Sequence, residues 1–310
     1  MLNIQRILCP TDLSRESDEA LRYAVALARA YKAKLILLNC SKSGHENTTN
    51  GSSSSATLNA FKVALVEHLG ITPLSEMNWE PVTVYNVEDP GEEIVRQAER
   101  LGIDLIVMRS RRRPHAALLL GSTAETVSRL APCPILVTHP QEREWVGFST
   151  GEIDLNRILI AYDFSNGAEL ALDYGVLLAE QYQAQLHLLY VLRNSDGLEN
   201  DLAATRFNNS GSIIATSRLQ RAVPKQVSLS CQVVSSVRFG KPYEQILECA
   251  SENRIDLICV GTNSDKLSFQ TILGSNVDRI LRQAPCPILV ARAVRTARAS
   301  MLSSKSVSGI

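Results

Sequence analysis

The sequence predicts an α/β fold with two tandem domains, each an open, five-stranded, mainly parallel sheet with helices on both faces. Short apolar runs alternate with segments of helical periodicity, and this alternation is typical of parallel strands joined by helical crossovers. The same order of segments occurs twice along the chain. The length of 310 residues also suits about two domains.

Local patterns predict the elements of the first half. Residues 4–10 form a short apolar run, which predicts a buried strand. Between residues 15 and 31, apolar side chains recur at helical spacing and predict an amphipathic helix. Leu35–Leu38 is wholly apolar, as expected for a parallel strand covered on both faces. The complete prediction places strands near 4–10, 34–40, 81–87, 104–109 and 134–138, and helices near 15–31, 57–69, 91–101 and 121–130.

The second half repeats the first. Asn156–Asp163 matches Gln5–Asp12 at an offset of 151 residues (163 − 12), and Ala284–Val290 repeats Ala131–Val137 at an offset of 153 (284 − 131). The drift from 151 to 153 indicates two net insertions in the second copy. A period of this length indicates a duplicated domain rather than a solenoid. We therefore expect a first domain over 1–140, a linker over 141–155, a second domain over 156–292 and a disordered tail over 293–310.

Composition excludes several classes of protein. Hydrophobic residues make up 45% of the chain and charged residues 21%, as in ordinary globular domains. The 32 basic and 32 acidic residues cancel, so neither nucleic acid nor a membrane is an expected partner. No apolar run reaches the roughly 18 residues of a membrane span, and the first residues lack a signal-peptide pattern, so we expect a cytoplasmic protein. The seven cysteines form no CxxC pair and lie mostly in apolar runs, which predicts buried, reduced thiols.

In folds of this kind, ligands bind beyond the carboxyl ends of the strands, where the strand order reverses. One such strand end in the second half carries Gly261-Thr262-Asn263-Ser264, and nine residues after Ser264 the sequence Gly274-Ser275-Asn276 opens the next helix. Backbone N–H groups at such turns and at a helix N-terminus suit a phosphate chain. Glycine lets the backbone approach the ligand without a side chain in between. These residues therefore predict a phosphate-binding loop.

Both halves resemble universal stress protein domains, and the chain is similar to the tandem members of that family. The resemblance rests on a strand that ends in Asp12 or Asp163, an Asp-Leu-Ile strand, the glycine loop and a Pro-Cys-Pro-Ile-Leu-Val strand. It implies a Rossmann-like fold, a role in the stress response and, in some members, a pocket for an adenine nucleotide. It also implies that the last strands, 134–138 and 287–292, pair and make the two copies an internal pseudo-dimer; a further homodimer stays open.

The glycine loop of the second copy nearly keeps the family's pattern. Nucleotide-binding members carry G-x2-G-x9-G-(S/T), and this copy has Gly261-x2-Ser264-x9-Gly274-Ser275, so serine replaces the second glycine. Serine is small and keeps its N–H, and the resemblance therefore implies a weakened nucleotide site. The implied contacts with ATP or another adenine nucleotide, with or without Mg²⁺, are Ala161, Asp163, Val191, Gly261, Ser264, Gly274, Ser275 and Asn276.

The first copy departs further from that pattern. Arg109 and Arg112 occupy the loop-glycine positions, and eight residues separate Arg112 from Gly121-Ser122. Large side chains where the backbone should touch phosphate oppose the family's usual mode of binding. The guanidinium groups themselves suit phosphate, and a solvated basic loop without a ligand is the alternative. The weaker set of site residues is therefore Asp12, Arg109, Arg112, Gly121 and Ser122.

Several of these residues also have a structural interpretation. Asp12 and Asp163 either face the nucleotide or cap the following helix. A serine follows each of them two residues later and could equally serve as the helix cap. Val191 either offers its backbone to adenine or is a core residue at a strand end. Ser275 and Asn276 open a helix, where capping and phosphate binding use the same N–H groups.

The sequence contains no evident catalytic constellation. The five histidines do not share metal-ligand spacing with a cysteine or carboxylate, and neither a nucleophile elbow nor a Walker loop occurs. The sequence thus predicts a non-enzymatic binding and regulatory module of the stress response, with nucleotide bound mainly by the second copy. One alternative is a protein with vestigial pockets that acts through protein partners or a small apolar ligand between the copies. A slow ATPase or nucleotidyl transferase has less support.

Overall fold

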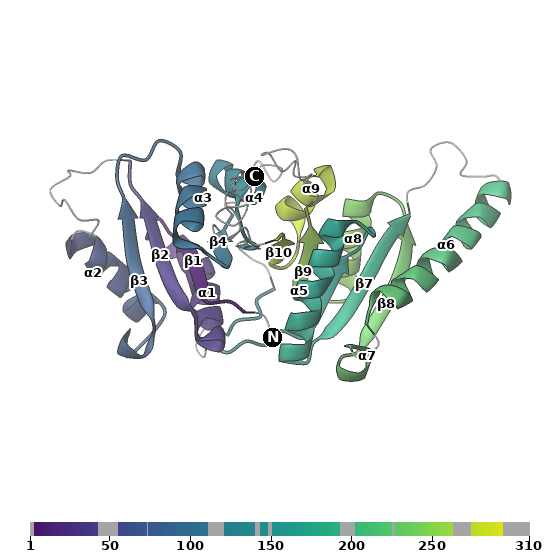
Figure 1. Cartoon of the computed structure of the whole chain (residues 1–310), viewed down its shortest axis with the longest axis horizontal. Helices are drawn as coiled ribbons and strands as arrows, with labels where there is room; N and C mark the ends of the chain where they lie inside the picture. The colour runs from purple at the N-terminus through teal and green to yellow at the C-terminus, as the bar shows by residue number, and fades with distance from the viewer. Residues whose placement is uncertain are drawn as a thin grey trace, which may run out of the picture.

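A single ten-stranded sheet runs through both copies of the repeat (Figure 1). The computed structural model describes residues 3–42, 55–72, 74–110, 121–139, 143–147, 151–192, 202–224, 227–262 and 274–293. The strand order is β3-β2-β1-β4-β5-β10-β9-β6-β7-β8. Each copy therefore contributes five strands, as the sequence predicts, and the α/β fold class is confirmed.

The first copy contains its elements close to the predicted positions. Its strands are β1 (Arg6–Pro10), β2 (Lys34–Cys40), β3 (Trp79–Val84), β4 (Leu105–Arg109) and β5 (Ile135–Thr138). Its helices are α1 (Asp18–Tyr31), α2 (Ser55–Val63), α3 (Pro90–Leu101) and α4 (Ser122–Leu130). The predicted helix over 15–31 starts with a 3-10 turn at Arg15–Ser17, and the one over 57–69 ends in a π-helical turn at Ala64–His68.

The second copy has the same order of elements with a longer helix at its outer edge. Its strands are β6 (Arg157–Ala161), β7 (Gln185–Leu192), β8 (Val233–Phe239), β9 (Leu257–Gly261) and β10 (Ile288–Ala291). Its helices are α5 (Asn166–Tyr182), α6 (Leu202–Ala222), α7 (Val227–Ser230), α8 (Pro242–Glu252) and α9 (Ser275–Gln283). The predicted disordered tail lies, apart from residue 293, outside the described residues, as does most of the loop before α2.

The two copies join through their last strands. β5 and β10 run antiparallel, with Leu289 opposite Leu136, whereas every other named strand pair in the sheet is parallel. These strands lie within the predicted ranges 134–138 and 287–292. The internal pairing of the copies is therefore present in the sheet itself.

Alternate strand residues face two separate cores. On one face the sheet packs against α1, α2, α5 and α6, and on the other against α3, α4, α8 and α9. Ile7 and Cys9 contribute to the first core, and Leu8 between them contributes to the second. The strands are thus covered on both faces, which explains their wholly apolar runs. Six of the seven cysteines are buried and Cys40 is partly buried.

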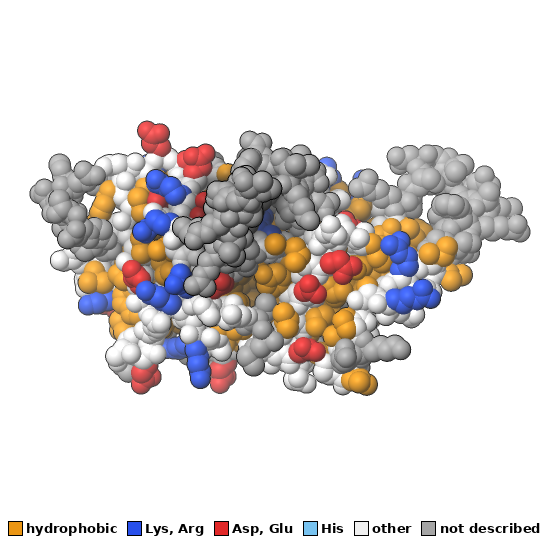
Figure 2. All heavy atoms as spheres, in the orientation of Figure 1, with side chains coloured by type: hydrophobic (Ala, Val, Ile, Leu, Met, Phe, Trp, Pro, Cys, Tyr) orange, Lys and Arg blue, Asp and Glu red, His pale blue; other side chains and the backbone are white. Residues whose placement is uncertain are grey.

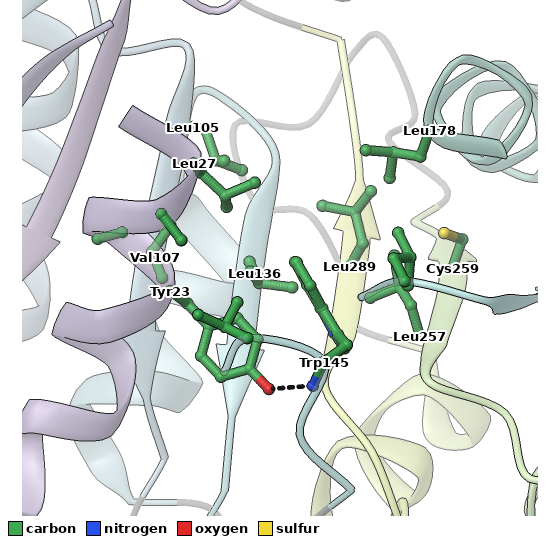
Figure 3. Close-up of a cluster of buried hydrophobic side chains, with 14 of the residues drawn as sticks. Tyr23, Leu27, Leu105, Val107, Leu136, Trp145, Leu178, Leu257, Cys259 and Leu289 are labelled. Carbon is green, nitrogen blue, oxygen red and sulfur yellow. Dashed lines mark hydrogen bonds between the residues drawn. The ribbon is translucent and has the colours of Figure 1, made fainter. Parts of the chain in front are cut away.

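The predicted linker forms part of the junction between the copies. Trp145 is 3% exposed and lies between α1 of the first copy and strands β10 and β9 of the second (Figure 3). Its ring meets that of Tyr23 edge-on with centroids 4.7 Å apart, and its backbone N–H donates to the Tyr23 hydroxyl. The Arg143 guanidinium donates to the Ile255 carbonyl, and Glu144 pairs with Arg22. Apolar burial and polar contacts thus hold this segment against both copies.

A buried arginine joins the copies on the opposite face of the sheet. Arg292 follows β10 and donates to the carbonyls of Ser128 and Ala131, at 2.5 and 2.8 Å. These carbonyls end helix α4 of the first copy, where a cation is favourable to the helix dipole. On the face in Figure 2, acidic and basic side chains of the described residues are interspersed over both halves, in keeping with the zero net charge.

Candidate functional site

In the part of the chain that the structure describes, each copy has a cavity at the carboxyl ends of its strands. The cavity of the second copy measures about 420 Å³ and lies between strands β6, β7 and β9 and helices α8 and α9. The cavity of the first copy measures about 660 Å³ and lies between the corresponding elements. Both volumes fall in the usual range for small-molecule sites, roughly 300–1,000 Å³. The repeat therefore builds two candidate ligand sites.

The structure brings most of the predicted residues of the second copy together. One cavity is lined by Ala161, Asp163, Val191, Gly261 and Asn276. Gly274 and Ser275 start helix α9 beside Asn276 but do not line the cavity. Ser264 lies outside the described residues.

The weaker set in the first copy also converges. Asp12, Arg109, Gly121 and Ser122 line the larger cavity, and Arg112 lies outside the described residues. This cavity contains a further cation that the sequence interpretation missed, Lys42. The only signal for it was its place just beyond the strand predicted over 34–40.

The two aspartates fix the turns that leave the first strand of each copy. The Asp163 carboxylate accepts from the backbone N–H of Ser165 at 3.1 Å, and Asp12 accepts likewise from Ser14. The helix cap in the second copy is Ser165, whose hydroxyl accepts from the Ala168 N–H. Asp163 therefore lies at the cavity without capping α5, and its role toward a ligand stays a prediction.

A direct backbone contact explains one of the loop glycines. A Cβ added to Gly261 would overlap the carbonyl group of Gly167 at the start of α5. A Cβ added to Gly167 would lie 2.7 Å from the Thr262 carbonyl oxygen. The end of β9 and the start of α5 thus touch through backbone atoms. Gly261 is required for this packing, whereas the sequence interpretation assigned its lack of a side chain to the ligand alone.

The first copy fills the same place with an ion pair. Glu16 and Arg109 occupy the positions of Gly167 and Gly261 in the repeat, and their side chains approach to 3.1 Å. Arg109 Nε also lies 3.5 Å from a carboxylate oxygen of Glu19 in α1. The Arg109 side chain is only 14% exposed. It is therefore held by two carboxylates, Glu16 in the 3-10 turn and Glu19 at the start of α1.

Glu19 is a partly buried acid whose charge opposes folding. Burial raises its pKa from 4.5 to about 7, and the nearby Arg109 guanidinium and Thr138 hydroxyl offset only part of this effect. Because the pKa of Glu19 is raised, its protonated form favours the folded state. This contribution to the free energy of unfolding is complete below pH 4.5 and is lost as the pH rises through 7.

Glu19→Gln should therefore stabilise the protein at pH 8 by about 1–3 kcal/mol. The upper value is the free energy that corresponds to the whole pKa shift, and the lower value allows for solvent screening. At pH 4, below the ordinary pKa of the side chain, the variant and the wild type should be nearly equal. Urea unfolding at both pH values measures the difference. Glu16→Gln, at a more exposed carboxylate, is the control, and equal effects of the two variants at pH 8 would contradict the assignment.

The rim of the second cavity is aromatic, which the sequence interpretation missed. Tyr162 and Tyr190 line the cavity, and their rings meet the Phe164 ring edge-on, with centroids 5.1 and 4.9 Å away. The Arg218 guanidinium lies 3.9 Å from the centre of the Phe164 ring. In the first copy, Thr11 stands at the position of Tyr162 and donates or accepts a hydrogen bond with Ser17. The two cavities therefore differ in chemistry.

Comparison with known proteins assigns the family. The sequence profile of the universal stress protein family matches residues 3–139 and again residues 155–292. The chain belongs to the universal stress protein family. A universal stress protein of Bacillus subtilis, YxiE, is 27% identical over 146 residues, which are 44% of this chain and 99% of that protein. The tandem arrangement of universal stress protein domains is thus established.

Solved structures share the fold of this universal stress protein over almost its whole length. A universal stress protein from Archaeoglobus fulgidus DSM 4304 is similar with a TM-score of 0.59 and 21% identity, covering 94% of this chain and 99% of the other. A functionally unknown protein from Pseudomonas aeruginosa PAO1 gives a TM-score of 0.66 at 20% identity, covering 97% and 98%. At these identities the likeness concerns the fold alone.

The described residues offer no candidate for a membrane span or a metal site. Within them, no helix has both the length and the apolar character needed to cross a bilayer. The same residues hold no group of three or more histidine, cysteine or acidic side chains arranged to bind a metal ion. Among the described residues that line the second cavity, Asp163 alone carries a carboxylate that could hold a divalent cation arriving with a nucleotide.

Proposed function

We propose that the protein is a stress-response binding module whose second copy binds an adenine nucleotide, ATP, ADP or AMP. The observation that carries this proposal is the convergence of Ala161, Asp163, Val191, Gly261 and Asn276 on one cavity. These residues come from the ends of three strands and the start of one helix. A cavity of about 420 Å³ is large enough for a nucleotide of this class.

The lining of this cavity includes both apolar and polar groups. Val191, Val260 and Ile246 supply apolar surface, which suits a purine base. Asp163 would accept hydrogen bonds from the ribose hydroxyls. No side chain of the described residues caps the start of α9 at Gly274, which leaves the N–H groups of its first turn for phosphate.

Calorimetric titration of the full chain with ATP, ADP and AMP tests the proposal. We expect one site per chain and about tenfold weaker binding in both Asp163→Asn and Asn276→Ala, since each removes a polar contact. The matched controls are Asp12→Asn and Thr123→Ala at the equivalent positions of the first copy, which should leave ATP affinity unchanged. Two equal sites, or loss of binding only in the control variants, would contradict the proposal.

The principal alternative, vestigial pockets with a small apolar ligand between the copies, gains no support from the junction. The apolar cavity there, beside Trp145 and Leu289, measures about 30 Å³. That is little more than the space of one or two water molecules. Millimolar ATP that fails to raise the melting temperature would nevertheless favour a protein acting through partners.

A further inference from the structure

The two outer strands of the sheet differ in how their free edges are protected. β3 ends the sheet in the first copy and β8 ends it in the second, and each pairs with a single neighbour among the described strands. The free edge of a strand offers N–H and C=O groups to which another strand can add. β3 contains Pro81, a residue that opposes such addition, whereas β8 contains no proline. The second copy therefore has the less protected edge.

The hydrogen bonds between β7 and β8 show which groups of β8 point outward. The Leu186 N–H donates to the carbonyl of Gln232. The Gly240 N–H donates to the carbonyl of Leu192. The even-numbered residues of β8 therefore turn their backbone groups toward β7, because this direction alternates along a strand. The odd-numbered residues turn theirs to the free edge: Val233, Ser235, Val237 and Phe239.

Ser235 takes the place in the second edge that Pro81 has in the first. Pro81 lies opposite Leu37 of β2, and Ser235 lies opposite Leu188 of β7, the residue that repeats Leu37 at the offset of 151 (188 − 37). The hydrogen bonds between β2 and β3 make position 81 an outward one as well. The first edge thus lacks an N–H at the position where the second edge presents one.

Exposed apolar side chains gather around the edge of β8. Four large apolar side chains of the described residues are exposed, and all of them belong to α6, α7 or β8: Ile213, Ile214, Leu229 and Val234. Apolar side chains also lie on the surface over α6, toward the right of Figure 2. Single exposed apolar residues are ordinary, but a group of them at one place is typical of an interaction surface.

Helix α6 turns one of these side chains toward the free edge. α6 packs on β7 and β8, outside α5. The Arg218 guanidinium lies over the ring of Phe164, which precedes α5, so this flank of α6 faces α5. Ile213 precedes Arg218 by five residues, which is about 140° around an α-helix. It therefore lies on the opposite flank, beside the edge of β8, and is 69% exposed there.

We propose that β8 pairs antiparallel with β8 of a second copy of this chain, about a two-fold axis at Ser235. In this register Ser235 lies opposite the partner's Ser235, and Val233 lies opposite the partner's Val237. These are outward residues on both strands, so their N–H and C=O groups can bond across the axis. The surface for the homodimer that the sequence leaves open is thus the outer edge of the second copy.

The charges of β8 are compatible with pairing to a second copy. Its charged residue, Arg238, forms ion pairs with Glu248 and Glu252 of α8 and is 23% exposed. In the proposed register Arg238 lies opposite the partner's Gln232, so the two arginines do not face each other.

The two-fold axis also brings the apolar group of each copy against the same group of the other. The chain already contains one junction of this kind. In the antiparallel pair of β5 and β10, Leu136 lies opposite Leu289, the residue that repeats it. A second copy therefore fits this edge by shape, by apolar surface and by charge.

Analytical ultracentrifugation of the full chain over a range of micromolar concentrations tests the proposal. We expect a concentration-dependent dimer that dissociates about a hundredfold more readily in Ser235→Pro, because proline removes an N–H from both strands at the axis. The hydrogen bonds to β7 stay intact in this variant, and Pro81 shows that the repeat accepts a proline at this position. Urea unfolding checks that the variant keeps its fold.

Ile213→Lys tests the same surface without altering β8. It should weaken the dimer about tenfold, because each copy brings a new charge to the apolar group around the axis. The control is Asn59→Lys on α2 of the first copy, where the side chain is also exposed, and it should leave the dimer unchanged. A dimer that persists in both Ser235→Pro and Ile213→Lys would overturn the proposal. So would a chain that stays monomeric at every concentration, which would leave this edge to a strand of another protein.

Discussion

Gly261→Ala should destabilise the protein by about 3 kcal/mol, because the new methyl group has no space. The added Cβ would overlap the backbone of Gly167, and backbone atoms cannot rotate away as a flexible side chain can. Either α5 or β9 must shift, and β9 is a central strand paired on both sides. Urea unfolding followed by circular dichroism measures the loss.

Gly274→Ala is the matched control for this prediction. Gly274 has a φ of −58°, and nothing lies within 4 Å of a Cβ built on it. Alanine there should cost less than about 1 kcal/mol, the usual loss for a poorer helix cap. Equal losses in the two variants would show that Gly261 and Gly167 are not in backbone contact. Substitution of Gly261 by a large residue is therefore unsuitable as a test of ligand binding.

Trp145→Ala should cost about 3–5 kcal/mol, the usual loss for a large aromatic residue removed from a core. The side chain is 3% exposed and packs between Tyr23 and Leu136 of the first copy and Leu289 and Leu257 of the second (Figure 3). Its removal leaves a cavity where the copies meet. Urea unfolding should show a lower midpoint for both halves, since the junction is shared.

Trp79→Ala is the control for the second prediction. Trp79, the only other tryptophan, is partly buried on the edge strand β3. Its loss should cost less, because solvent already reaches its side chain and neighbouring groups can relax into the space. Trp145→Phe should recover part of the loss. A larger effect at Trp79 than at Trp145 would contradict the assignment of Trp145 as the centre of the junction.

Strand positions were predictable from the sequence because both faces of this sheet are covered. Wholly apolar runs such as Leu35–Leu38 have few alternatives to a buried parallel strand. The pairing of the last strands was implied by the resemblance to universal stress proteins, and β5 and β10 do pair. Ala284–Val290 also repeats Ala131–Val137. Copies that match this closely must form the same elements, so a prediction for one copy extends to the other.

Contacts between distant residues were not predictable in the same way. Trp145 stands in a short segment without periodicity, and only the meeting of two domains buries it. Gly261 and Gly167 lie far apart in the sequence, and no sequence pattern predicts that their backbones touch. The pairing of Arg109 with Glu16 and Glu19 likewise depends on how α1 lies over β4. The sequence around Arg109 is therefore compatible both with a solvated basic loop and with an arginine held in ion pairs.

A crystal structure of the full chain grown with ATP is the most direct test of the unequal pair of sites. We expect the adenine nucleotide in the second cavity, with its base against Val191 and Val260 and its phosphates at the start of α9. The cavity of the first copy should hold no adenine. Nucleotide bound in the first cavity alone, or equally in both, would contradict the assignment of the second copy as the nucleotide site.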